Sequence, residues 1–305
     1  MSSLSLKHRR IAREIGYSST KLTRLDEATK ANAKIADAIA ALALESNPSL
    51  SEWSPHTSEV GTSDLARVRE SMKHFVRDWS TEGAEERRRI FEPILYALQR
   101  IGSTGERVLV PGCGLGRLAW EISELKFDVT ANELSSFMNL ALDFVDSSTS
   151  VSEHVIHPYA HWFSHQKSND SMFRSVRFPD VVPRLHESLH LERRDFLSLP
   201  TSQPYDFIVT LFFIDTSSNI LDTLEHIHAL LKPGGIWINL GPLLWSSQAK
   251  LELSLQEVYK ASEAVGFHFL EIEGLQRRTI DCEYTRDEEA MMRWTYRAEY
   301  WVAKR

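Results

Sequence analysis

Apolar positions recur at helical spacing through the first hundred residues of the chain. Residues 24–45 are rich in Ala, Leu, Lys and Glu, and the same periodicity returns in residues 64–80 and 84–102. Pro93 falls inside the last of these helices, where it would kink or delay the helix. The polar stretch 46–63 separates the first predicted helix from the other two. The pattern therefore predicts a helical N-terminal region.

Beyond these helices, short apolar runs alternate with helical segments, which is typical of βαβ units and a parallel sheet. Residues 107–110 and 127–133 are predicted strands, and the helix after the second strand begins at a serine cap, Ser135 or Ser136. The run DFIVTLFFID, residues 206–215, is almost continuously apolar. Such a run indicates a central strand buried on both faces.

The alternation continues toward the C-terminus. Residues 217–235 predict a capped helix stopped by its Pro-Gly-Gly, and a strand over 236–242 follows. Ser254 and Glu257 form a capping-box pair for a helix that stops at Gly266.

The last two apolar runs, residues 268–276 and 297–305, have no helix between them that is long enough for a crossover. They are therefore predicted to pair antiparallel. The predicted fold class is α/β, with a mostly parallel sheet, an antiparallel C-terminal strand and an N-terminal helical cover.

Composition narrows the class of partner. The chain has 305 residues and a net charge of -7, so no overall positive field favours nucleic acid or an anionic membrane. Cys113 and Cys282 are too few for a disulfide framework and fit a reducing cytoplasm, with the nucleus as a second compartment. Neither an apolar signal segment nor a run of roughly 18 apolar residues is present, so neither export nor membrane insertion is indicated. The expected partner is a small-molecule substrate, and a homodimer is the candidate assembly.

The stretch VLVPGCGLGRLAWEIS, residues 108–123, places three glycines after the first predicted strand. Gly112, Gly114 and Gly116 permit a tight turn and close approach of the backbone to a ligand at the end of a parallel strand. A dinucleotide-binding loop would have its third glycine at Arg117, and a Walker motif is absent. The turn therefore argues against a diphosphate ligand.

Two acidic residues favour adenosine as part of the ligand. Glu133 ends the second predicted strand, where a carboxylate can accept hydrogen bonds from both ribose hydroxyls. Asp195 is placed to take an adenine amino group while Phe196 covers the base. Each acid alone is also compatible with a solvated strand end or a helix cap. Together with the glycines they point to S-adenosylmethionine (SAM).

Longer strings carry a specific resemblance. The glycine stretch, FVRDWS at 75–80, FFIDT at 212–216 and LKPGGIWINLGPLL at 231–244 resemble the carnosine N-methyltransferase family from about residue 60 onward. The resemblance implies a Rossmann-like class I methyltransferase with SAM as cofactor and methylation of an imidazole nitrogen in carnosine. It also implies a helical cover over residues 1–100, a core over 101–305 and an insertion at about 155–190.

Matching motifs imply roles for particular residues. Arg77 would grip the methionine carboxylate of SAM, with His74 where the family has glutamine, and Asp215 would face the substrate. The residues implied at the cofactor are His74, Arg77, Gly112, Gly114, Glu133, Asp195 and Phe196. The residues implied at the acceptor are Asp215, Ser246, Tyr284, Trp294, Tyr296 and His161.

The departures from the family concern the acceptor. The substrate-contacting histidine of the family follows GPLLY, whereas Ser246 follows GPLLW here. Of three family tyrosines, Tyr284 and Tyr296 are kept and Trp294 replaces the third. If the acceptor is an imidazole, Asp215 can accept the N–H of one ring nitrogen and make the other more nucleophilic. Ser246 can hydrogen-bond but cannot act as a base near neutral pH.

Four histidines lie close together at positions 154, 157, 161 and 165. On a helix the last three would share a face, where a zinc site or a catalytic base can be imagined, but no cysteine or acidic ligand accompanies them. We therefore expect no metal. His161 is kept as a candidate pocket residue, beside the alternative that it is an ordinary hydrogen-bonded helix histidine.

Two alternatives remain open beside the carnosine-like enzyme. One is a tailoring methyltransferase acting on N, O or S of a cyclic peptide or aromatic natural product, which the changes at Ser246 and Trp294 favour. The other is a fold without catalytic activity that binds SAM or a protein partner. The intact glycines, Glu133 and Asp215 argue against this last alternative.

Overall fold

The computed structural model describes residues 3–47, 62–184 and 187–305. Its N-terminal region is helical, as predicted, and most of the polar stretch 46–63 lies outside the described residues. The elements are α1 (Leu6–Glu14), the π-helical turn η1 (Tyr17–Lys21), α2 (Leu22–Ser46), α3 (Thr62–Trp79) and α4 (Ala84–Ile101). Helix α4 continues through Pro93.

The main sheet has the strand order β5-β2-β1-β6-β7-β10-β8, and β9 also pairs with β10. Strands β5, β2, β1, β6 and β7 run parallel, whereas β10 is antiparallel to β7, β8 and β9. The strands are β1 (Arg107–Pro111), β2 (Asp128–Asn132), β5 (Leu189–Glu192), β6 (Tyr205–Leu211), β7 (Leu231–Gly241), β8 (His268–Phe269), β9 (Arg278–Glu283) and β10 (Thr295–Lys304). The predicted α/β class and the antiparallel C-terminal strand are confirmed.

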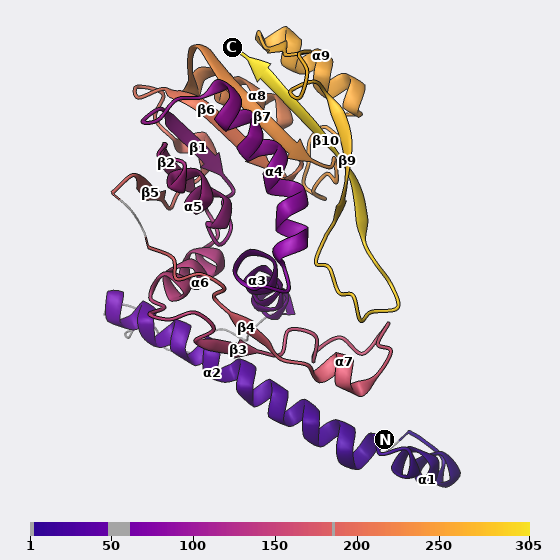
Figure 1. Ribbon diagram of the computed structural model, residues 1–305. Coiled ribbons are helices and arrows are strands. Elements are labelled where there is room, and N and C mark those ends of the chain that lie inside the picture. The colour runs from indigo at the N-terminus through magenta and orange to yellow at the C-terminus, as the bar shows by residue number, and fades with distance from the viewer. Residues whose placement is uncertain (1–2, 48–61, 185–186) are drawn as a thin grey trace.

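Helices cover both faces of this sheet (Figure 1). Side chains of α4 and α5 pack with Val108 and Val110 on one face, and those of α8 and α9 pack with Leu109 and Trp237 on the other. The connecting helices are α5 (Arg117–Glu124), α6 (Ser136–Asp146), α8 (Ile220–Leu230) and α9 (Leu255–Val265). Because successive residues of β1 point to opposite faces, a fully apolar strand is what this position requires.

The chain between α6 and β5 in the sequence forms a smaller unit. It consists of the antiparallel pair β3 (His154–Ile156) and β4 (Val176–Phe178), with α7 (Asn169–Phe173) between them. Phe178 of this unit stacks on Phe75 of α3 at 4.5 Å between ring centroids. The unit is thereby packed against the helical region.

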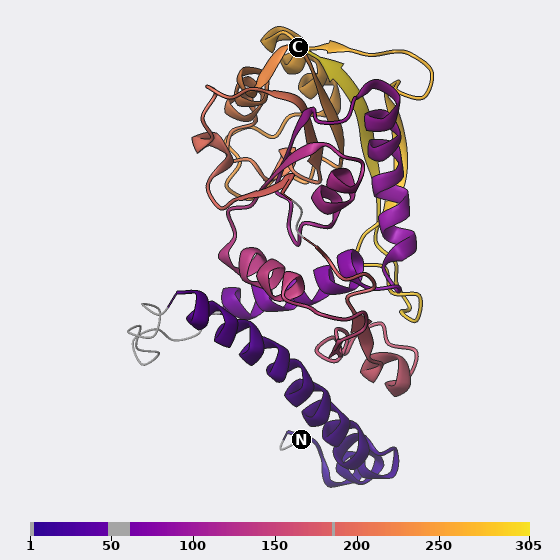
Figure 2. The ribbon, with the colours of Figure 1, turned by 60° about the vertical axis from the view of Figure 1, so that its left-hand side comes forward.

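Helix α1 and the adjoining part of α2 extend away from the sheet in both views (Figures 1 and 2). Ala28 and Ile35 are the buried residues of α2. Within the described residues, no helix combines the length and the apolar character that a membrane span needs.

The predicted helix caps are correct. Ser135 is the N-cap of α6 and accepts a hydrogen bond from the Met138 amide. Ser254 and Glu257 form the capping box of α9, and Gly266 ends that helix in the left-handed conformation at φ 118°. These local signals act within a few residues, so the sequence is sufficient to locate them.

Two predicted boundaries are wrong. Strand β6 ends at Leu211 instead of residue 215, because Phe212 adopts φ 51° and the chain turns into the short 3₁₀ helix η4 (Ile214–Thr216). Helix α8 ends at Leu230, before the Pro-Gly-Gly, because Leu231 already pairs with Tyr205 as the first residue of β7.

Two further features differ from the sequence pattern. Strand β9 has no counterpart among the predicted elements, since its polar residues lie at the edge of the sheet where little apolar surface is required. The histidine stretch is not a helix: residues 154–156 form β3 and the following residues form turns, so His157, His161 and His165 do not share a helix face.

Candidate active site

The glycine turn follows β1, and its three glycines, which alternate with other residues, all adopt the left-handed conformation. The φ angles are 63° at Gly112, 57° at Gly114 and 73° at Gly116. A Cβ at Gly112 would lie 2.6 Å from the Phe213 ring, whereas a Cβ at Gly114 would meet nothing within 4 Å. Gly112 therefore admits Phe213, and Gly114 borders open space at the end of the sheet.

Glu133 is the residue after β2 and is tied to this turn. The Gly114 amide donates to Glu133 Oε2 at 3.0 Å, and the Ser135 amide donates to Oε1 at 2.8 Å. Both oxygens keep lone pairs for a further donor. The structure thus brings Glu133 and Gly114 together.

Helix α3 places Arg77 beside the glycine turn. Arg77 donates to both carboxylate oxygens of Asp78, at 2.7 and 3.0 Å, and the two residues line a cavity of about 30 Å³ together with Gly112. Burial lowers the pKa of Arg77, but the adjacent Asp78 carboxylate raises it further, so the net pKa lies above the ordinary value. Burial raises the pKa of Asp78, but Arg77 and His74 together lower it by more, so it lies well below its usual range. This pair is charged throughout the physiological pH range.

His74 lies one turn before Asp78 on α3. Its Nδ1 is 3.5 Å from Asp78 Oδ2, and its Nε2 is 3.6 Å from Glu70 Oε1. His74 therefore adjoins the Arg77–Asp78 pair.

Asp195 and Phe196 follow β5. Asp195 is exposed, and its Oδ1 accepts the Leu197 amide at 2.9 Å as the cap of the 3₁₀ helix η3 (Phe196–Ser198). Phe196 is buried, with its ring 5.3 Å from Phe213 and 5.0 Å from His226 between centroids. Phe213 therefore connects this pair to the glycine turn.

Asp215 is buried in η4, with 5% of its surface exposed. The Leu244 amide donates to Asp215 Oδ2 at 2.8 Å, and the Ser246 amide donates to the Asp215 carbonyl at 3.3 Å. Burial raises the pKa of this carboxyl, and the hydrogen bond from Leu244 opposes the rise. Asp215 and Ser246 are therefore joined through their backbones. The Ser246 hydroxyl accepts a hydrogen bond from the Gln248 amide at 3.1 Å.

Three aromatic rings gather beside the cavity that Arg77 and Gly112 line. Phe212 lies 5.7 Å from Tyr284 and 5.9 Å from Tyr296, and the two tyrosine rings are 5.7 Å apart. Tyr284 donates to Glu70 Oε1 at 3.2 Å, and burial raises its pKa. Because Phe212 also lines the cavity with Arg77, this aromatic cluster adjoins the predicted cofactor site.

Sequence reasoning missed two residues of this region. Phe212 lies in the FFIDT string, and its backbone is left-handed at φ 51°. A sequence pattern signals this conformation at a glycine but not at a phenylalanine. Glu86 on α4 is buried and accepts the amides of Thr285 and Arg286 at 3.0 and 2.8 Å. These bonds hold the segment after Tyr284 against α4 across about two hundred residues of sequence.

His161 and Trp294 line a separate hollow of about 110 Å³ together with Lys73. Burial, with Arg69 and Lys73 nearby, lowers the pKa of His161 to about 4, so its ring is neutral. Trp294 is 60% exposed, and its carbonyl accepts the Tyr284 amide at 3.1 Å.

The other histidines of this stretch have different partners. His157 Nδ1 lies 2.9 Å from the Phe173 carbonyl, and His154 packs on Phe144. Within the described ranges, no three potential ligands among His, Cys, Asp and Glu converge on a metal position.

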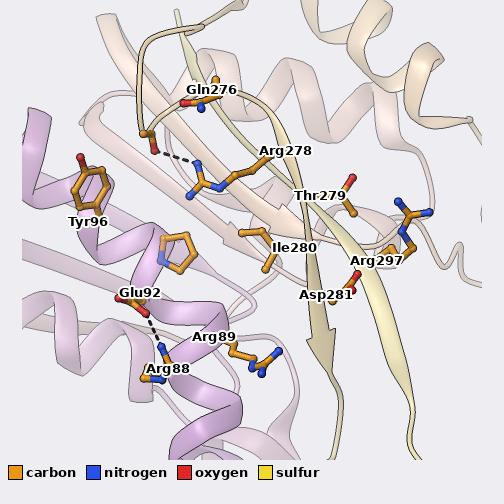
Figure 3. Close-up of a pocket in the computed structure, with 12 residues that line it drawn as sticks. Arg88, Arg89, Glu92, Tyr96, Gln276, Arg278, Thr279, Ile280, Asp281 and Arg297 are labelled. Carbon is orange, nitrogen blue, oxygen red and sulfur yellow. Dashed lines mark hydrogen bonds and ion pairs between the residues drawn. The ribbon is translucent and has the colours of Figure 1, made fainter.

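A wider groove of about 1140 Å³ lies between α4 and β9 (Figure 3). Arg88 on its α4 side binds Glu92 at 3.0 Å, and Arg278 on its β9 side donates to the Gly274 carbonyl at 3.0 Å. None of the predicted site residues lines this groove. Its size therefore does not make it the active site.

The strand order, the glycine turn at the carboxyl end of β1 and the acid after β2 define the class of Rossmann-like, SAM-dependent methyltransferases. The sequence profile of the family described as carnosine N-methyltransferase matches residues 55–305. The chain belongs to this family and is a SAM-dependent N-methyltransferase.

The relatives carry the family name. A carnosine N-methyltransferase of Schizosaccharomyces pombe is 32% identical over 335 residues, which cover 100% of this chain and 88% of that protein. One from Mus musculus is 33% identical over 262 residues, covering 81% of this chain and 64% of that protein. Among solved structures, TehB from Haemophilus influenzae is 18% identical with a TM-score of 0.46, covering 77% of this chain and 67% of that chain.

Proposed function

We propose that this enzyme transfers the methyl group of SAM to an imidazole ring nitrogen of carnosine or a closely related histidine dipeptide. The relatives are named for carnosine, and the observation that carries the proposal here is Asp215. Its buried carboxylate lies in η4, the short helix that follows β6, and the Leu244 amide orients it.

The residues around the glycine turn fit SAM. Arg77 offers a permanent cation to an amino-acid carboxylate, Gly114 leaves open space, and Glu133 offers two oriented oxygens to ribose hydroxyls. We assign the adenine end to Asp195 and Phe196, and a flanking position to His74. Bound SAM supplies an electrophilic methyl group on a sulfonium.

Asp215 orients the acceptor ring in this proposal. Its carboxylate accepts the N–H of one imidazole nitrogen, which leaves the lone pair of the other nitrogen directed at the methyl carbon. The methyl group of bound SAM would pass to that nitrogen while the electron pair of the carbon–sulfur bond stays on sulfur, and the ring N–H proton would leave to the Asp215 carboxylate. The acceptor needs alignment and exclusion of water more than a strong base.

The aromatic cluster of Phe212, Tyr284 and Tyr296 supplies the wall for the acceptor. Phe212 also lines the cavity shared by Arg77 and Gly112, which supports this assignment. Trp294, His161 and Ser246 are assigned to the outer part of the acceptor site. Of these, Trp294 and Ser246 are positions at which the chain departs from its family. Residues 1–100 are proposed to cover the cofactor, and the position of Arg77 on α3 supports this.

The test is methyl transfer to defined acceptors. The purified enzyme is incubated with labelled SAM and carnosine, and in parallel with cyclic dipeptides and phenols. We expect a methylated carnosine whose ring nitrogen is identified by NMR. Transfer to the cyclic dipeptides or phenols with none to carnosine would overturn the proposal.

We also propose a cytoplasmic or nuclear location and a homodimer. The two free cysteines, Cys113 and Cys282, support a reducing compartment. Light scattering during size-exclusion chromatography tests the dimer, and a mass equal to one chain would contradict it.

A further inference from the structure

The carbonyl groups of residues 77–80, at the C-terminal end of α3, are all bound by groups from outside that helix. Arg87 Nη1 donates to the first and the last of them, at 2.6 and 2.7 Å. Arg117 Nη1 donates to the second at 3.0 Å, and the Asp180 amide donates to the third at 2.8 Å. A helix end normally leaves such carbonyls to water or to a cap, so this end is unusually well fixed.

The Asp180 carboxylate joins the two arginines. Its Oδ1 accepts Arg117 Nη1 at 2.6 Å, and its Oδ2 accepts Arg87 Nη2. The side chains of Arg87, Asp180 and Arg117 are 6%, 14% and 10% exposed. Arg117 also donates to Glu121 Oε1 at 2.8 Å, and Asp180 is the carboxylate that the two buried arginines share. Such a shared partner matters because an unpaired buried charge is costly.

Arg117 connects this ion cluster to the glycine turn. It is the first residue of α5, directly after Gly116, and its guanidinium lies over the rings of Trp79 and Trp120 at 4.9 and 5.2 Å. The position that would hold the third glycine of a dinucleotide loop thus carries a structural arginine. The cluster spans from the turn to the helix end that bears Arg77.

We propose that Asp180 is a positioning residue for SAM binding. Acting through Arg87 and Arg117, it fixes the spacing between Arg77 and the glycine turn that the amino-acid part of SAM requires. This inference rests on the proposed contact of Arg77 with the cofactor. Asp180 itself lies in the loop after β4, outside the group of residues assigned to SAM.

The first test replaces the charge of Asp180. An Asp180→Asn variant is expected to bind SAM roughly tenfold more weakly by calorimetry, because a small displacement of a binding group has a large effect. Its kcat at saturating SAM should stay within about twofold of the parent value, since the acceptor chemistry is untouched. Asp170→Asn is the control, because Asp170 belongs to the same segment but forms an exposed ion pair with Arg24. Unchanged SAM affinity in Asp180→Asn would overturn the inference.

A double-mutant cycle separates positioning from general loosening. In an Arg77→Ala background, Asp180→Asn should cause no further loss of SAM affinity, because its effect passes through Arg77. An equal loss in both backgrounds would contradict the positioning role alone. Wild-type affinity in Arg77→Ala itself would contradict the assignment of Arg77 under the proposed function.

A second variant covers the case in which Asp180→Asn does not fold. Arg87→Lys keeps the positive charge but cannot present the guanidinium fork that reaches both carbonyls and Asp180. The same weakening of SAM binding is expected, with the same dependence on Arg77. Full affinity in this folded variant would overturn the inference.

Discussion

The amide of Gly114 donates a hydrogen bond to Glu133 Oε2 at 3.0 Å, which links the glycine turn after β1 to the acid after β2. The second oxygen of Glu133 is held by the Ser135 amide at 2.8 Å. A carboxylate fixed at both oxygens is oriented before the ligand arrives. Its orientation therefore costs little on binding.

Replacement of Glu133 should weaken SAM binding. In Glu133→Ala, the ribose loses a charged acceptor, and a hydrogen bond to a charged group contributes about 1.5–3 kcal/mol. We expect a SAM Kd roughly 10- to 100-fold higher by calorimetry. Glu192→Ala is the matched control, since Glu192 ends the neighbouring strand β5 and its side chain pairs with Arg194. Equal loss of affinity in both variants would argue against a role for Glu133 at the ribose.

A methyl group at Gly114 should block SAM. Gly114→Ala places a Cβ in the open space beside the turn and forces alanine into φ 57°, at a cost of about 1–2 kcal/mol. Gly105→Ala also forces alanine to a positive φ, at 83°, and its Cβ likewise meets nothing within 4 Å, but Gly105 lies before β1. Both variants should lose stability in chemical denaturation, and SAM binding should fall in Gly114→Ala alone. Loss of binding in both would make backbone strain the cause.

Removal of Glu86 should affect the acceptor more than the cofactor. Glu86→Ala leaves the Thr285 and Arg286 amides without their acceptor, at about 1–3 kcal/mol each, and releases the segment after Tyr284. The KM for carnosine should therefore rise more than the KM for SAM in steady-state kinetics. Glu85→Ala is the control, because Glu85 pairs with Arg88 and Arg89 at the surface. A larger change in the KM for SAM would contradict this role.

The features that could be predicted from the sequence are those set by residues close together in the chain. The N-terminal helices, strands β1 and β2, the Ser135 cap and the Ser254–Glu257 capping box follow from periodicity and short-range hydrogen bonds. The glycine turn was located for the same reason.

The remaining parts of the site depend on tertiary contacts. The end of β6 is set by Phe212, whose φ of 51° is maintained among Tyr284 and Tyr296. The bond from Glu86 to the Thr285 amide joins residues that are 199 positions apart. No local pattern encodes such contacts, because each depends on where the whole sheet brings the two segments together.

Replacement of Asp215 should reduce turnover. In Asp215→Asn, the amide can still accept the Leu244 hydrogen bond but no longer offers a charged acceptor to the imidazole N–H. We expect kcat to fall by about 10²–10⁴-fold, the range for loss of a positioned proton acceptor. Asp222→Asn, at an exposed position in the first turn of α8, should leave turnover unchanged.

Asp215→Asn should also stabilise the fold at neutral pH. A carboxyl whose folded pKa is raised contributes stability that is fully present below its unfolded pKa, near 3.8, and that is lost as pH rises through the folded pKa. At pH 7 the buried carboxylate of Asp215 is therefore a destabilising charge, and Asp215→Asn removes it. The Tm of the variant should exceed that of the parent at pH 7, and the difference should shrink as the pH is lowered toward 4. A variant with a lower Tm at pH 7 would show that the Leu244 bond needs the charge, and that burial is not the dominant effect at this site.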